Sequence, residues 1–319
     1  EWAACIQRFA DYGHNGLEAC RYQNPVWDAS AWRDWRMPEV FPEQVLVGEA
    51  RVALDRLADE VEADPRFRFP DEREVPLPLA LSFPSAGSLL VQAAGAGRSE
   101  ALAILFNGVL RVLTSFPPAK VRLTLVDPVG LGESFSALMQ LGDYDESLVG
   151  GRIWTETPHI ESRLAELTEH IEKVIQKYLR NRYANVDEYN REAGEMAEAY
   201  QFLVLADFPA GFSDLALERL ASILSSGPRC GVFPLLFHDM RQRLPDALDL
   251  REWRQKGLVL RRGDTGFFVH DDALVRSPVA SEAPPPNAIL NRVLEAVGTQ
   301  CQEAKRVEVR SEERRVGKE

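Results

Sequence analysis

Short apolar runs alternate with longer segments of helical periodicity over most of the chain. Each run is rich in leucine or β-branched residues and is bounded by turn residues, a pattern typical of strands that are buried on both faces. The runs cover 88–92, 121–127, 202–207 and 231–237. We therefore predict an α/β fold with a mainly parallel sheet and helices on both of its faces.

The segments between the runs have the apolar spacing of amphipathic helices. Predicted helices cover 99–113 and 213–225, and a longer one begins at Thr157, directly before Pro158. Proline is favoured in the first turn of a helix, which supports this starting point.

Two more apolar runs, over 257–262 and 265–270, flank the dipeptide Gly263-Asp264. Glycine and aspartate favour the tight turns of hairpins. We expect these runs to form a closing hairpin at one edge of the sheet.

Changes in composition and in the hydrophobic pattern divide the chain into four regions. Residues 1–42 are rich in tryptophan and predict a short helical lead-in, and 43–276 form the main domain. Residues 277–310 predict a proline-rich linker and a short amphipathic helix that ends near Val297. Residues 311–319 lack apolar periodicity, resemble translated vector sequence and are left out of the fold prediction as a non-native tail.

The composition limits the size of the core, the cellular location and the kinds of partner that we expect. With 319 residues, of which 45% are hydrophobic, the chain can bury a large core. No window approaches the roughly 18 apolar residues of a membrane span, so none is expected in this fragment. The four cysteines lack the spacing of a zinc site or a disulfide framework, which favours the cytoplasm, although a longer parent protein could be membrane-associated. A net charge of -12 opposes a broad nucleic-acid surface.

A glycine loop connects the first apolar run to the first predicted helix, which is the setting of a phosphate-binding loop. Aligned on the pattern GxxxxGK[ST], Arg98 replaces the lysine, whereas Ser99 keeps the hydroxyl group that would bind Mg²⁺. The predicted nucleotide-binding residues are Gln92, Ala93, Ala94, Gly95, Ala96, Gly97, Arg98 and Ser99. Backbone N–H groups can hold a phosphate without a particular side chain, but a planar guanidinium cannot act as the compact charge of lysine. The alternative is a small-residue turn that caps an ordinary helix.

The apolar run over 202–207 ends in Asp207, where a nucleotide-hydrolysing site would carry two acids, one for Mg²⁺ and one for the attacking water. Asp207 is the candidate catalytic and metal-binding acid. Two registers are open, because Asp207 matches the water-side acid in one and the metal-side acid in the other. A third reading is an aspartate that starts the turn before Pro209.

The run over 231–237 leads into His238 and Asp239, which are candidate sensors of a nucleotide γ-phosphate. The same pair can instead cap a loop through local hydrogen bonds, and we favour this second interpretation.

Several blocks together resemble the FtsK/SpoIIIE (HerA/FtsK-type) P-loop ATPases. The segment 121–138 resembles the family's strand that ends in Asp-Pro-Lys, with Asp127 and Pro128 matching and Val129 in place of the lysine. The segment 152–190 resembles the family's long helix and the Asn-x-x-x-Tyr-Asn motif that follows it. The resemblance covers about 87–271 in the family's order. It implies a RecA-like core, with ATP and Mg²⁺ as cofactors.

The residues that differ from the family lie at the positions expected to bind nucleotide and Mg²⁺. The resemblance therefore implies a degenerate module of a tandem-domain protein. On this hypothesis the module binds ATP weakly, hydrolyses it slowly or not at all, and supports the assembly or regulation of a translocase. Its expected partners are other ATPase modules of the same chain or ring, with DNA bound only in the assembled state. The alternatives are an active translocase of DNA or protein and an interaction domain without nucleotide.

Overall fold

The computed structural model describes residues 35–53, 74–180, 182–270, 277–280 and 282–316, so most of the predicted lead-in lies outside the described residues. The strands are β1 (Gln44–Ala53), β2 (Glu74–Ser82), β3 (Ser88–Ala93), β4 (Val121–Val126), β5 (Tyr200–Phe208), β6 (Val232–Asp239), β7 (Gly257–Arg262) and β8 (Phe267–Val269). The main helices are α3 (Arg98–Ser115), α4 (Thr157–Lys173), α5 (Val186–Ala193), α6 (Asp214–Ser226), α7 (Leu250–Lys256) and α8 (Asn287–Val316).

The central sheet has six strands in the order β4-β5-β6-β3-β7-β8. The pairs from β4 to β7 are parallel, and β8 alone runs antiparallel to its neighbour β7. The four predicted runs are therefore all strands, and the predicted hairpin closes one edge. Because parallel strands end at the same edge, the residues that follow β3, β4, β5 and β6 lie close to one another.

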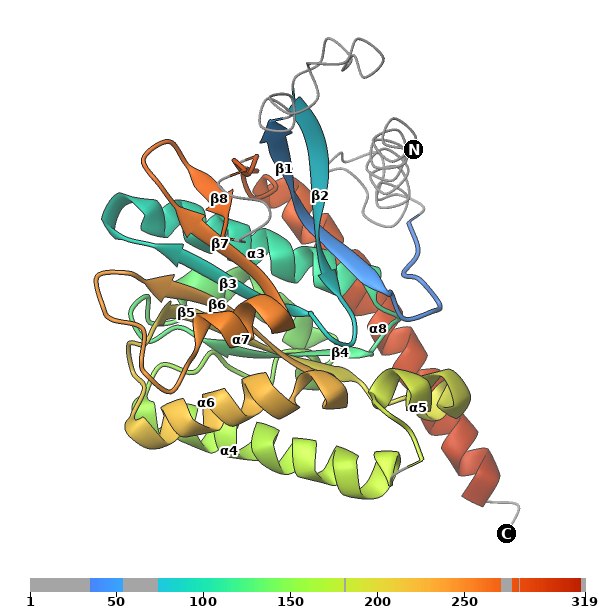
Figure 1. Ribbon diagram of the computed structural model, residues 1–319. Helices are drawn as coiled ribbons and strands as arrows, with labels where there is room; N and C mark the ends of the chain where they lie inside the picture. Colours follow the sequence, from blue (N-terminus) through green and yellow to red (C-terminus); the bar gives the residue numbers. More distant parts are fainter. Residues whose placement is uncertain (1–34, 54–73, 181, 271–276, 281, 317–319) are drawn as a thin grey trace, which may run out of the picture.

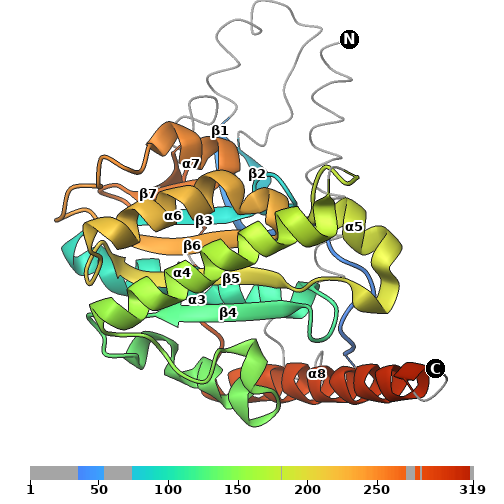
Figure 2. The ribbon, with the colours of Figure 1, turned by 90° about the horizontal axis from the view of Figure 1, so that it is seen from below.

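Helices cover both faces of this sheet, as the apolar runs predicted. Helices α4 and α6 pack side by side on one face, and α3 lies on the other (Figures 1 and 2). Strands β3, β5 and β6 are buried along their whole length, which explains their uninterrupted apolar sequences. The core is continuous from the sheet into these helices.

A two-stranded antiparallel ribbon of β1 and β2 was not predicted as strands. Strand β2 contains Pro76 and Pro78, which argue against a strand in a central position. Among the described strands β2 pairs only with β1, so its other edge is open and residues without a backbone N–H are tolerated there. The ribbon packs on α3, where Gly108 leaves room for Val47.

The C-terminal region is joined to the domain by more contacts than a linker would make. Residues 277–280 bridge the ribbon to β8 through backbone hydrogen bonds from Arg51 N to Pro278 O and from Val279 N to Phe267 O, both of 2.8 Å. Helix α8 continues to Val316, beyond the predicted end near Val297, and it buries Leu294, Val297 and Cys301. The sequence predicted only the first third of this helix, because the later residues have a weaker apolar pattern. Among the described residues, no helix is both long enough and apolar enough to cross a membrane.

We predict that Gly298→Ala destabilises the protein by roughly 1–3 kcal/mol, the usual cost of overpacking. A Cβ atom at Gly298 would lie 2.3 Å from Cδ2 of Tyr144, so the ring or the helix must move. In an unobstructed helix the same change would stabilise by up to about 1 kcal/mol. Chemical denaturation measures the sign, and an increase in the free energy of unfolding would contradict the packing of α8 on this surface.

Candidate functional site

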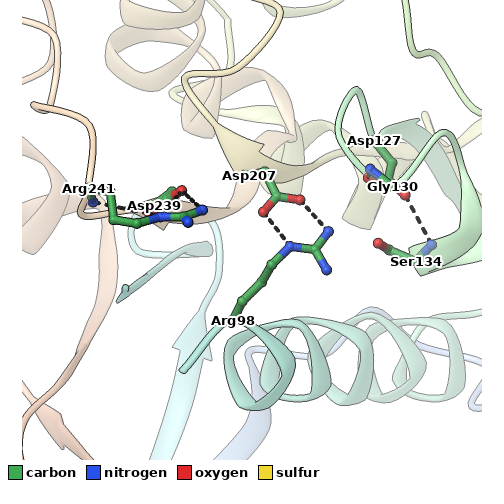
Figure 3. Close-up of polar contacts among 7 residues, drawn as sticks. All are labelled: Arg98, Asp127, Gly130, Ser134, Asp207, Asp239 and Arg241. Carbon is green, nitrogen blue, oxygen red and sulfur yellow. Dashed lines mark hydrogen bonds and ion pairs between the residues drawn. The ribbon is translucent and has the colours of Figure 1, made fainter. Parts of the chain in front are cut away.

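The carboxyl edge of the sheet brings together the residues that the sequence selected from distant segments. Figure 3 shows Arg98 at the start of α3, Asp207 near the end of β5, and Asp239 at the end of β6 with Arg241 in the loop that follows. Asp127, directly after β4, lies on the opposite side of Asp207 from Asp239 and Arg241. The carboxylates of Asp207, Asp127 and Asp239 each accept hydrogen bonds from nearby groups of the protein.

The glycine loop is short and is wound into a turn. Residues Gly95–Gly97 form a 3₁₀ turn that runs directly into α3. The N–H of Gly97 donates to the carbonyl oxygen of Ala94 at 3.0 Å, and the N–H of Arg98 donates to that of Gly95. Two of the N–H groups expected to hold a phosphate are thus engaged within the turn. Gly95, at a φ of +53°, is exposed with no atom close to its Cβ position.

Gly97 has a structural reason to be glycine. A Cβ atom there would lie 2.2 Å from Cδ of Arg262, which crosses the loop from β7. Nε of Arg262 is 3.3 Å from Oε2 of Glu100 in the first turn of α3. The loop glycine therefore accommodates an arginine side chain of the same protein, a contact that the nucleotide-binding pattern did not predict.

Arg98 forms a bidentate ion pair with Asp207. Its Nε and one terminal nitrogen donate to the two carboxylate oxygens, each at 2.7 Å. The Asp207 side chain is only 3% exposed and that of Arg98 is 34% exposed. The hydrogen bonds to Asp207 raise the pKa of Arg98, so the guanidinium stays charged. This is the geometry in which arginine binds a carboxylate most strongly.

The backbone at Asp207 turns sharply to present this carboxylate. Its φ is +53°, in the left-handed region that aspartate tolerates better than most residues. The carbonyl oxygen of Asp207 accepts a hydrogen bond from the N–H of Ala210 at 3.0 Å, which forms the turn expected before Pro209. Ala206, the preceding residue, is buried within β5. Asp207 is thus the acid that faces the glycine loop, and its catalytic role stays a prediction.

Gln92 and His238 pair behind the loop, on the neighbouring strands β3 and β6. Nε2 of Gln92 is 3.1 Å from Nδ1 of His238, and Nε2 of His238 is 3.0 Å from the carbonyl oxygen of Gln242. A neutral imidazole protonated on Nε2 satisfies both contacts, because Nδ1 then accepts and Nε2 donates. Burial lowers the pKa of His238, which favours this neutral form. These contacts are those of a loop cap, and a sensor role stays a prediction.

Asp239 is bound by its own loop. Arg241 donates to both of its carboxylate oxygens, with the shortest contact at 2.6 Å, and the N–H of Arg241 donates to Oδ1 at 3.1 Å. The guanidinium hydrogen bonds hold the pKa of Asp239 below its usual value. Asp239 is therefore ionised and paired locally.

Asp127 organises the loop after β4, a role that the sequence analysis did not assign to it. Its oxygens accept from the N–H groups of Gly130 at 2.9 Å and Ser134 at 3.0 Å. A Cβ atom at position 130 would lie 2.5 Å from the carboxylate. The spacing of an aspartate three residues before a glycine was the available signal for such a turn.

This arrangement does not fit a Mg²⁺-bound nucleotide as it stands. Both oxygens of Asp207 accept from Arg98, and two N–H groups of the loop are engaged within it. Ser99, the other predicted metal ligand, is exposed on the first turn of α3. The part of the chain that the structure describes has no group of three or more histidine, cysteine or acidic side chains able to hold a metal ion.

Comparison with known proteins identifies the fold. No family model matches the chain, and no curated protein sequence does. Among solved structures, EssC (ATPases 2 and 3) from Geobacillus thermodenitrificans matches 86% of the chain with a TM-score of 0.54 and 12% identity. EccC (ATPases 2 and 3) from Thermomonospora curvata, in complex with a signal sequence peptide, matches 85% with a TM-score of 0.51 and 16% identity.

The pCW3 conjugation coupling protein TcpA, in a monomer form with ATPgS, matches 82% of the chain and 75% of its own length, with a TM-score of 0.52 and 12% identity. The chain spans 51% of the EssC structure and 49% of the EccC structure. These matches confirm the RecA-like P-loop fold that the resemblance to FtsK/SpoIIIE-type ATPases implied.

We predict that Arg98→Met lowers the free energy of unfolding by roughly 2 kcal/mol, because it leaves the buried carboxyl group of Asp207 without its guanidinium partner. The cost is below that of a fully buried pair because Arg98 is partly exposed. Arg98→Met combined with Asp207→Asn should recover part of the loss in a double-mutant cycle.

The matched control is the exposed pair of Arg243 and Asp246, whose side chains are 85% and 83% exposed. Arg243→Met should leave chemical denaturation unchanged, since exposed pairs contribute little. Equal effects of Arg98→Met and Arg243→Met would show that the Arg98 pair does not stabilise the fold.

Proposed function

We propose that the chain is a degenerate FtsK/SpoIIIE-type ATPase module that supports the assembly or regulation of a translocase. On this proposal it binds ATP weakly and hydrolyses it negligibly. The observation that supports it best is the ion pair between Arg98 and Asp207, which uses two charged groups that a hydrolytic site would direct at the nucleotide.

The chemistry of phosphoryl transfer explains why this pair matters. The protein contributes mainly positioning and charge stabilisation, through a cation on the β- and γ-phosphates and an acid that holds Mg²⁺. Arg98 and Asp207 neutralise each other, so a nucleotide must first break a charge-assisted pair to use either group. The engaged turn at Gly95–Gly97 and the crossing Arg262 add to that cost.

The proposed partners are other ATPase modules, in the same polypeptide or in a ring. The EssC and EccC structures each hold ATPases 2 and 3, and this chain spans about half of each. Another match is the cytoplasmic domain of the Thermomonospora curvata type VII secretion ATPase EccC, and we place this chain in the cytoplasm as part of the proposal. Protein and DNA both stay candidates for the translocated substrate.

A nucleotide-free interaction domain is the second candidate. It is favoured by the contact between Gly97 and Arg262, which gives the loop glycine a role without phosphate. An ATP titration separates the two proposals, because only a degenerate ATPase module retains measurable binding. An active translocase is a third candidate, and turnover in the presence of DNA distinguishes it.

We predict an ATP turnover below about 0.01 per second, well under the 1–100 per second of ordinary kinases. A coupled phosphate-release assay with Mg²⁺, with and without duplex DNA, measures it. The control is Ser99→Ala, which should not change the residual rate if that rate comes from contamination. Turnover near one per second that is lost in Ser99→Ala would refute the degenerate assignment.

We also predict poor binding of duplex DNA by the isolated chain at physiological salt, with a dissociation constant weaker than about 10⁻⁶ M. The net charge of -12 repels phosphates. Fluorescence anisotropy of a labelled duplex measures the affinity, and light scattering fixes the oligomeric state of the same sample. Nanomolar binding by a monomer would contradict this expectation.

A further inference from the structure

The amino edge of the central sheet, at the opposite end from the candidate site, gathers exposed cations. Helix α4 ends there and strands β4 and β6 begin there, with α5 beside them (Figures 1 and 2). The exposed cations on these segments include Arg122, Lys173, Lys177, Arg180, Arg182 and Arg229. On a chain with a net charge of -12, this local concentration of positive charge favours an anionic partner.

Several of these cations have no acidic partner within the described residues. Arg182 pairs with Glu192 at 2.9 Å, and both side chains are exposed. Among the residues that the structure describes, Arg122, Lys177 and Arg180 form no ion pair. Their charge is therefore available to an anion outside the protein.

Three half-buried tyrosine rings lie among the cations. The ring centres of Tyr178 and Tyr189 are 5.1 Å apart, and those of Tyr183 and Tyr189 are 5.7 Å apart. Nζ of Lys177 lies 5.6 Å from the centre of the Tyr178 ring, and the guanidinium of Arg182 lies 4.9 Å from that of Tyr183. Tyrosine joins an apolar ring to a polar hydroxyl group, so it is stable at a boundary between water and an apolar phase. Tyrosine with lysine and arginine is typical of protein surfaces at the level of lipid headgroups.

Two apolar side chains are exposed close to these rings. Ile175 is 38% exposed and lies in the π turn Val174–Leu179, which continues α4. Met196 is 56% exposed. The segment after Met196 is fixed to α5, because the side chain of Asn190 exchanges hydrogen bonds of 2.7 and 3.0 Å with the backbone of Glu198. Turns of the π type are rare and occur frequently at functional sites.

The apolar side chains distinguish between two classes of anionic partner. Duplex DNA offers phosphates to the cations but no apolar phase to Ile175 or Met196. A bilayer of anionic lipids offers both, with phosphates at its surface and hydrocarbon directly below them. The surface therefore fits an anionic bilayer better than a nucleic acid.

We infer that Ile175, Lys177, Tyr178, Arg180 and Met196 belong to a docking surface for the anionic headgroup layer of a lipid bilayer. The cations contact lipid phosphates, and the apolar side chains enter the layer between the headgroups. The contact is peripheral, so it is reversible and weakened by salt. In this orientation the carboxyl edge with the candidate site faces away from the bilayer. The inference does not depend on nucleotide binding, so it stands or falls separately from the proposed function.

The test is co-sedimentation of the full chain with lipid vesicles. Vesicles of phosphatidylcholine alone should leave the chain in solution, whereas vesicles of equal parts phosphatidylcholine and phosphatidylglycerol should bind it at low salt and release it at high salt. Lys177→Glu combined with Arg180→Glu should weaken binding about 25-fold or more, because each cation near an anionic surface contributes about fivefold. Ile175→Ser combined with Met196→Ser should also weaken binding, although the charge is unchanged.

The matched control is Arg152→Glu combined with Arg243→Glu. This variant changes the net charge equally, but both residues are exposed at the carboxyl edge. It should weaken binding far less than the Lys177 and Arg180 variant. Equal losses in the two variants would overturn the inference.

Three other results would also overturn it. The first is equal binding to neutral and anionic vesicles, or none to either, and the second is full affinity in the Ile175→Ser, Met196→Ser variant. The third is binding of a labelled DNA duplex more tightly than anionic vesicles, which would assign the surface to nucleic acid. Thermal unfolding checks that each variant is folded, and Lys177→Gln with Arg180→Gln replaces the glutamate variant if that one does not fold.

Discussion

Asp207 places a negative charge where water has almost no access, and the carboxyl edge of the sheet is arranged around the compensation of that charge. An unpaired carboxylate in such a place costs several kcal/mol. Arg98 supplies the compensating positive charge from the start of α3, which follows β3, whereas Asp207 lies near the end of β5. Strand β6 lies between them in the sheet. The ion pair therefore ties together two elements that are not hydrogen-bonded neighbours.

Other charged and polar groups along this edge of the sheet are also paired within the protein. Asp239 is paired with Arg241, Asp127 accepts two backbone N–H groups, and His238 is neutral between Gln92 and Gln242. A site that holds a charged ligand keeps some of these groups free and directed at it. Here the charged groups of Asp207, Asp239 and Asp127 accept hydrogen bonds from the protein itself.

The local sequence pattern predicted some parts of this structure and could not predict others. Apolar runs predicted β3, β5 and β6 because strands buried on both faces need uninterrupted apolar side chains. Strand β2 was missed because its prolines are tolerated only in a ribbon, which depends on the tertiary context. The ion pair joins residues 109 positions apart, and the sequence marked both members as unusual. It could not indicate that they meet, because that depends on where two loops end in space.

The sequence departs from a hydrolytic site in two ways, with Arg98 in place of the lysine and Asp207 as a single acid. Because these two residues pair with each other, both departures belong to one interaction. An arginine beside two acids would leave one carboxylate free for a metal, and a lysine beside one acid would leave a compact cation able to follow a phosphate. An arginine beside a single acid matches it in charge and in its bidentate geometry, so neither group is left over. Replacing only one member with an uncharged residue leaves a charge without its partner, whereas Arg98→Lys keeps the cation and loses only the planar, bidentate geometry.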